Sequence, residues 1–354
     1  MKSGSASVEF RDVDKAYGSV YAVKNVSFTI DAGRLVTLLG PSGCGKTTTL
    51  RLIAGLEIAT AGRIMIGTRD VTNFSAADRD VSMVFQSYAL FPHMSVLENV
   101  AYGPSVQGAS KARAREMAME KITLVGLGGL EARAPSELSG GQQQRVAVAR
   151  ALVLEPQVLL FDEPLSNLDA KLRRRVREEI RELQQKLSLT VAYVTHDQEE
   201  ALAVSDKIIV MANARIAQMG TPHELYEEPK DLFVADFIGD ATILDGRVET
   251  VSGDIARVRL GECVLDLPAR GAKPGPVKIA VRPQSFALDS QSPAAPSLRG
   301  KITKAAYLGK HLEYTVETAL GELFVIETAG VSPLTQGADV FVTRARRGVV
   351  IVAE

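Results

Sequence analysis

The sequence predicts an α/β domain with a mainly parallel sheet, followed by a smaller all-β domain. Its 354 residues, at about 150 per domain, suggest two domains. Short apolar runs alternate with helical stretches in the first part, which is typical of a sheet covered on both faces. Alternating and β-branched runs with dense Gly and Pro follow. We expect a flexible tail at 1–7, the α/β domain at 8–239 with a helical subdomain at about 87–150, and the all-β domain at 240–354.

The first domain's strands are predicted from short apolar runs, and its helices from periodic apolar positions. Apolar residues of the stretch 171–187 recur at spacings of four, four, three and four, which indicates an amphipathic helix. The expected strands are 35–39, 81–85, 158–161 and 190–195, and the expected helices are 48–54, 111–125, 142–152 and 171–187.

The second domain is predicted to consist of strands separated by turns. A stretch rich in Ser and Pro at 289–297 is expected to be an exposed loop. The expected strands are 246–251, 255–260, 277–281, 312–318, 323–326 and 340–343.

Charge and composition exclude several classes of protein. Lys and Arg number 41 against 42 Asp and Glu, and the basic run in 171–187 forms i,i+4 pairs such as Arg174–Glu178, so no nucleic-acid partner is expected. The longest uncharged stretch, 81–97, contains polar residues and proline and predicts no membrane span. No apolar run follows the N-terminus, and Cys44 and Cys263 lie far apart. A soluble chain in a reducing compartment is predicted.

A phosphate-binding loop is predicted between the strand 35–39 and the helix that follows it. Its glycines let backbone N–H groups curl around phosphate oxygens, and the following helix points its positive end at them. Lys46 supplies a cation, the Thr47 hydroxyl can bind Mg²⁺, and Cys44 fills a variable position. The nucleotide-binding residues expected here are Gly40, Pro41, Ser42, Gly43, Cys44, Gly45, Lys46, Thr47 and Thr48.

A second acidic site is predicted at the end of the strand 158–161. Kinases, GTPases and many ATPases share the phosphate loop alone, so a further feature is needed to choose among them. Asp162 is placed near the metal, and Glu163 where it can orient or deprotonate a water. Paired carboxylates are about as often only a solvated strand end, and this pair alone does not decide the class.

The segment Leu138-Ser139-Gly140-Gly141-Gln142 resembles the signature motif of ATP-binding-cassette (ABC) ATPases. The resemblance to this family, whose fold is the P-loop NTPase cassette, covers about 8–239. It implies ATP and Mg²⁺ as ligands and further roles in motif order. Tyr17 would stack on adenine, Gln86 would sense Mg²⁺ and the transporter, Asp169 lies in the dimer-contact loop 166–169, and His196 is the switch histidine. The implied catalytic residues are Glu163, His196 and Gln86, and the implied metal ligands are Thr47, Gln86 and Asp162.

The signature segment also has a physical rationale. Ser139, Gly140, Gly141 and Gln142 begin a predicted helix, whose free N–H groups form a second anion site. In the family this site faces the ATP held by the other subunit. Since the chain has one set of motifs, an ATP-sandwich homodimer of two-fold related copies is expected.

Three further stretches resemble one branch of the family. The segment 85–94 is similar to the part of importer ATPases that contacts the membrane subunit. The stretch 225–239 resembles the junction in maltose, polyamine and ferric-iron importer ATPases, and 281–283 with 307–309 resembles their OB-like regulatory domain.

The resemblance implies the ATP-hydrolysing motor of an importer, held peripherally at the cytoplasmic face of the membrane. Its expected partners are a second copy of itself, two transmembrane permease subunits and, indirectly, an extracytoplasmic solute-binding protein. Ferric iron or a polyamine is the expected solute, with sugars or phosphorylated polyols as alternatives. A soluble ABC ATPase or a non-enzymatic binding module are alternative functions. The short distance from Lys46 to Ser139 leaves no room for the long coiled coil of the former, and the intact catalytic positions disfavour the latter.

Overall fold

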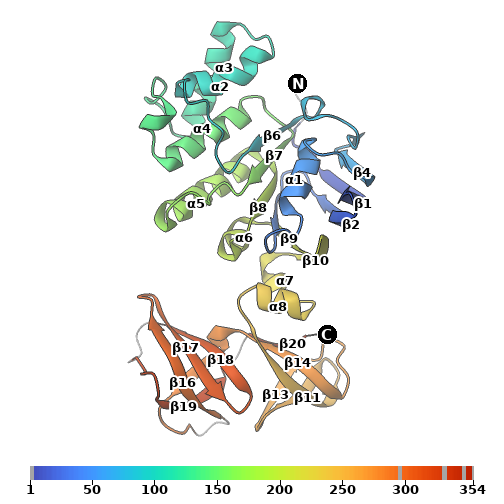
Figure 1. Cartoon of the computed structure of the whole chain (residues 1–354), viewed down its shortest axis with the longest axis vertical. Coiled ribbons are helices and arrows are strands. Elements are labelled where there is room, and N and C mark those ends of the chain that lie inside the picture. The colour runs from blue at the N-terminus through green and yellow to red at the C-terminus, as the bar shows by residue number, and fades with distance from the viewer. Residues whose placement is uncertain (1–3, 294–296, 329–332, 345–347, 353–354) are drawn as a thin grey trace. The chain divides into compact units, whose positions relative to one another are not determined.

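The computed structural model describes residues 4–293, 297–328, 333–344 and 348–352. The chain divides into two compact units, Met1–Pro222 and His223–Glu354. Figure 1 shows helices and strands alternating in the first unit, whereas the second consists mainly of strands. The predicted fold class, an α/β cassette followed by an all-β domain, is confirmed.

A six-stranded sheet forms the centre of unit 1. Neighbouring strands are parallel except for the antiparallel edge pair β10–β9. Every residue of β3 and β8 is buried, which explains why their sequences are continuous apolar runs. In sheet order the strands are β10 (Arg215–Gly220), β9 (Lys207–Ala212), β3 (Leu35–Leu39), β8 (Thr190–Thr195), β7 (Val158–Asp162) and β6 (Val81–Val84).

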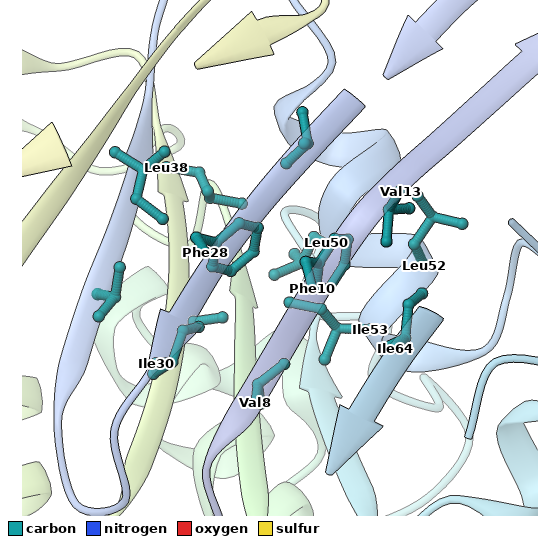
Figure 2. Close-up of a cluster of buried hydrophobic side chains, with 14 of the residues drawn as sticks. Val8, Phe10, Val13, Phe28, Ile30, Leu38, Leu50, Leu52, Ile53 and Ile64 are labelled. Carbon is teal, nitrogen blue, oxygen red and sulfur yellow. The ribbon is translucent and has the colours of Figure 1, made fainter. Parts of the chain in front are cut away.

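A second, antiparallel sheet in unit 1 was not predicted from the sequence. Bulges in β1 interrupt the two-residue period, so that Phe10 and Val13 are both buried although they are three residues apart. Figure 2 shows α1 (Lys46–Ala54) packed against side chains of this sheet, including Phe10 and Ile64. In sheet order the strands are β2 (Val20–Ile30), β1 (Val8–Tyr17), β4 (Ala61–Ile66) and β5 (Arg69–Asp70).

The remaining helices of unit 1 fall into two groups. Those of the predicted helical subdomain are α2 (Val96–Val106), α3 (Lys111–Leu124) and α4 (Gly140–Leu152), which share an apolar cluster. The others are α5 (Ala170–Leu187) and α6 (Gln198–Val204). On α5 the apolar stripe is buried at Val176 and Ile180, while Arg174 and Glu178 pair on the exposed face.

Unit 2 contains two antiparallel five-stranded sheets that share one apolar core. Its two short helices, α7 (Pro222–Glu227) and α8 (Leu232–Phe237), precede the strands. The first sheet has the order β13 (Cys263–Pro268), β12 (Ile255–Leu260), β11 (Thr242–Ser252), β14 (Gly275–Val281) and β20 (Val349–Val352). The second has the order β15 (Phe286–Asp289), β19 (Asp339–Arg344), β16 (Leu298–Tyr307), β17 (His311–Thr318) and β18 (Gly321–Thr328).

A buried arginine assigns the residues before 239 to unit 2. The guanidinium of Arg282 donates hydrogen bonds to the carbonyls of Tyr226, Ala235 and Ile238 and lies over the Tyr226 ring. These contacts connect α7 and α8 to the end of β14. The domain boundary expected at 239 therefore lies inside unit 2.

The N-terminal residues differ in part from the expected flexible tail. Ser5 donates to the Ser188 carbonyl at 2.6 Å, Ala6 donates to the Gln157 carbonyl, and Ser7 accepts from Gly67 at 2.8 Å. Residues 1–3 of that tail, and 294–296 of the expected loop 289–297, lie outside the described residues.

Two truncated chains test this boundary. A chain ending at Pro222 keeps the apolar clusters of unit 1, so we expect it to fold and bind ATP with full-length affinity. A chain ending at Gly239 also carries Leu225, Val234 and Ile238, which are fully buried in the intact protein. Exposing such side chains costs about 1.5–3 kcal/mol each.

We therefore expect a protease to trim the longer chain back toward 222, as mass spectrometry after limited digestion can show. Resistance of 223–239 to digestion, or an unfolded shorter chain, would contradict the boundary at 222.

Candidate functional site

The predicted phosphate loop lies between β3 and α1, where the backbone conformation requires glycine. Gly40, Gly43 and Gly45 have φ of 158°, 76° and 107°. A Cβ at Gly40 would clash with the Met211 carbonyl oxygen, and one at Gly45 with that of Ala22. No side chain caps α1, so its first N–H groups are open to an anionic ligand.

Lys46 is buried and directed into this loop. Its Nζ donates to the carbonyl oxygens of Gly40 at 2.7 Å and of Pro41 at 2.9 Å. The cation is therefore held beside the N-terminus of α1, and the two positive features act on the same space. This arrangement can bind the phosphates of a nucleotide.

Asp162 and Thr47 bring two oxygen ligands together. The Thr47 Oγ1 donates to Asp162 Oδ1 across 3.4 Å. Burial and the neighbouring charge of Glu163 raise the pKa of Asp162, whereas the Thr47 hydrogen bond lowers it. A half-buried carboxylate beside another carboxylate fits a divalent cation, and hydroxyl and carboxylate oxygens are the donors that Mg²⁺ prefers. The residues present therefore fit the expected Mg²⁺.

Glu163 and His196 meet at the carboxyl ends of neighbouring strands. The Glu163 Oε2 and His196 Nδ1 lie 3.0 Å apart. Glu163 has a left-handed backbone with φ of 45°, and its N–H donates to the Val194 carbonyl of β8 at 3.0 Å. Such a conformation in a non-glycine residue is typical of functional sites. The pair can accept a proton from a water and hold it.

The signature residues pack on the segment that follows β7. Ser139 caps α4 in a capping box with Gln142, whose side-chain oxygen accepts from the Ser139 N–H at 2.9 Å. A Cβ at Gly140 would lie 3.0 Å from Leu168, and one at Gly141 2.9 Å from Leu172. Close packing is therefore a second reason for these glycines, and the Gln142 side chain has a capping role within the chain.

Three more predicted residues lie around these two groups. Tyr17 ends β1 and is 49% exposed; partial burial and a hydrogen bond with Glu57 raise its pKa. Gln86 is exposed after β6, and its carbonyl accepts from the Asn167 side chain at 3.0 Å. Asp169 caps α5 by accepting from the Leu172 N–H at 3.0 Å. Asp169 thus has a structural role that the sequence did not reveal.

Two supporting residues escaped the sequence analysis. Arg150 donates to the carbonyls of Tyr88 and Ala89, two residues with left-handed backbone just after Gln86. Burial raises the pKa of Glu200, which accepts hydrogen bonds from the side chains of Thr195 and Tyr193. Neither residue belongs to a local motif, so only tertiary contacts identify them.

A phosphate loop, a strand-end acidic pair and a histidine on the neighbouring strand define the nucleotide-binding cassette of a P-loop ATPase. The ABC transporter family model matches residues 23–166, and the TOBE domain model matches 279–352. The chain belongs to the ABC transporter family and is an ATPase coupled to transport. In the described residues, no helix combines the length and apolar character that spanning a membrane requires.

Several curated relatives match almost the whole chain. It is 58% identical to the Fe(3+) ions import ATP-binding protein FbpC 1 of Rhizobium meliloti (strain 1021), over 98% of each chain. It is 57% identical to the Fe(3+) ions import ATP-binding protein FbpC of Brucella abortus (strain 2308), again over 98% of each.

Solved structures resemble the cassette. The dimeric structure of MJ0796, a bacterial ABC transporter cassette, matches with a TM-score of 0.54 and 31% identity over 61% of this chain and 98% of that one. The same cassette bound to ADP and Pi, in a dimeric post-hydrolysis state, matches with a TM-score of 0.54 and 32% identity over the same shares.

The variant Lys46→Ala tests the phosphate site. The phosphates would lose their nearest cation, so we expect ATP binding to weaken at least tenfold and turnover to fall to background. Equilibrium ATP binding and phosphate release measure this, with the exposed Lys186→Ala as the matched control. Normal turnover of Lys46→Ala would contradict the assignment.

Proposed function

We propose that this chain is the ATP-hydrolysing motor of a ferric-iron importer. The observation that carries the proposal is the 58% identity, over 98% of both chains, to a protein named for Fe(3+) import. The match extends through the TOBE domain, so it includes more than the common ATPase core.

In the proposed reaction, ATP and water give ADP and phosphate. The loop Gly40–Thr48 and Lys46 hold the phosphates, and Tyr17 stacks on adenine. Thr47, Asp162 and Gln86 would hold Mg²⁺, which supplies positive charge to the phosphate oxygens when it is bound. Glu163 accepts a proton from the attacking water, and His196 orients the Glu163 carboxylate and the phosphate. The 3.0 Å contact between these two side chains supports this division of roles.

The active form is proposed to be a dimer of two copies of this chain. Each signature segment, 139–142, would bind the ATP held by the partner, with Asp169 in the contact loop. Ser139 is exposed at the start of α4, which fits a surface that meets a partner's nucleotide. The dimeric cassettes among the similar structures also support this arrangement.

The remaining proposed partners are two transmembrane permease subunits and, through them, an extracytoplasmic solute-binding protein. A groove of about 900 Å³ beside α2 is lined by apolar and charged side chains, among them Met94, Leu97, Tyr102 and Arg115. It follows the segment 85–94 that resembles the permease contact, and it fits a short amphipathic helix. The chain would then lie peripherally at the cytoplasmic face of the membrane.

Uptake of radioactive iron into liposomes tests the proposal. The vesicles contain the full transporter, its solute-binding protein and ATP, and Fe(3+) is expected to accumulate and to stimulate ATP hydrolysis. Accumulation of a polyamine, a sugar or a phosphorylated polyol instead of iron would overturn the solute and leave the motor role intact. ATP hydrolysis by the chain without any permease association would favour a soluble ATPase.

The variant Glu163→Gln tests the proposed base. An amide keeps the shape but cannot accept the proton, and loss of a general base costs about 10²–10⁴-fold in rate. We expect ATP affinity to persist and an ATP-bound dimer to accumulate, visible by size-exclusion chromatography. Glu178→Gln, on the exposed face of α5, is the matched control. Hydrolysis above a tenth of the normal rate would show that Glu163 is not the base.

A further inference from the structure

We propose that Arg173 is a positioning residue that couples the proposed dimer-contact loop to His196. The Arg173 Nη2 donates to the Leu168 carbonyl oxygen at 3.1 Å. The Nη1 of the same guanidinium lies 3.4 Å from Asp197 Oδ2. One side chain on α5 therefore bridges two loops, one of which follows Glu163 and the other of which contains His196.

The first loop is tied to Glu163 from within. The Ser166 Oγ donates to the Glu163 carbonyl at 3.0 Å, and the Leu168 N–H donates to the Leu165 carbonyl. Leu168 is therefore part of a compact turn that begins at Glu163. A donor that binds the Leu168 carbonyl fixes this turn.

The second loop is held through both carboxylate oxygens of Asp197. The Oδ1 accepts from the Glu200 N–H at 3.0 Å and caps α6, while Oδ2 faces Arg173. The Asp197 N–H donates to Thr195 Oγ1, which in turn donates to Glu200 Oε2 at 2.7 Å. Asp197 directly follows His196, so Arg173 is the link between this network and the loop after Glu163.

The pair that these loops carry needs such support. The His196 side chain is 60% exposed and that of Glu163 is 23% exposed. An ion pair or hydrogen bond in solvent contributes only about 0–1 kcal/mol, so the 3.0 Å contact does not hold itself in place. The backbone around each residue must keep the two side chains together.

Arg173 differs from its neighbours in the basic run of α5. Arg174 and Arg175 make i,i+4 pairs on the exposed face, as the sequence predicts. Arg173 is turned inward instead, and it lines a small cavity of about 40 Å³ together with Glu163, His196 and Glu200. Its Nε is buried and has no hydrogen-bond partner within the described part of the chain.

An orphaned buried donor is unfavourable, so this conformation is not explained by local stability alone.

The bridge acts on turnover rather than on ATP affinity. Its hydrogen bonds and ion pair reach Leu168 and Asp197, and involve neither the phosphate loop nor Tyr17. Movement of the loop 166–169 on contact with a second copy would pass through Arg173 to the loop that carries His196. The inference rests on the proposed roles of Glu163 and His196.

The full chain carrying Arg173→Gln tests the bridge by steady-state ATPase kinetics. We expect kcat to fall about tenfold while KM for ATP stays within about twofold, since only orientation of the catalytic pair is lost. Arg173→Lys keeps the charge and should recover part of the rate. Arg174→Gln, one residue on and exposed, should match the unmodified chain. An Arg173→Gln variant with a normal kcat would overturn the inference.

A double-mutant cycle distinguishes the bridge from general damage to the fold. Asp197→Asn keeps an N-cap oxygen for α6 but removes the charge that faces Arg173. If the two residues act through one contact, the double variant should be about as slow as the slower single variant. Losses that multiply, or an equal loss of ATP affinity, would overturn the inference.

Glu163→Gln and His196→Ala, measured alongside, separate the two levels of proposal. If both are slow and Arg173→Gln is normal, the bridge alone is wrong. If both hydrolyse ATP normally, the proposed roles of Glu163 and His196 are wrong, and the bridge fails with them.

Discussion

The parallel pairing of β3, β8 and β7 is the constraint on which the nucleotide site depends. Parallel strands end at the same edge of a sheet, so the segments after these three strands are brought together. The phosphate loop follows β3, the acidic pair ends β7, and His196 follows β8. Since all three strands are buried on both faces, their ends cannot shift independently.

The site combines a rigid half with a half that side chains hold in place. The rigid half is the phosphate loop, because its glycines approach neighbouring carbonyls and α1 packs against an antiparallel sheet as well (Figure 2). The other half consists of loops whose catalytic side chains are largely exposed and whose positions depend on a few hydrogen bonds. A motor needs this difference, since binding requires a preformed cradle whereas coupling requires a part that can respond to a partner.

The strands that the sequence predicted best are those buried on both faces. The runs 35–39 and 190–195 agree with β3 and β8 residue for residue, because continuous apolar runs define such strands. The antiparallel sheet was missed, because bulges in β1 and β2 break the alternation that a half-buried strand should show. The boundary at 239 was displaced because Arg282 connects α7 and α8 to unit 2, a contact across more than forty residues.

The sequence by itself determined the nucleotide chemistry, because the phosphate loop, the acidic pair and the signature segment are each formed by residues that are adjacent in the chain. Only the tertiary structure decided which residues support them. In the basic run of α5, Arg173, Arg174 and Arg175 are chemically identical, and their different roles follow from the direction in which each leaves the helix. That direction matters only once β7, β8 and α5 have packed, since the partners of Arg173 belong to loops that this packing brings together.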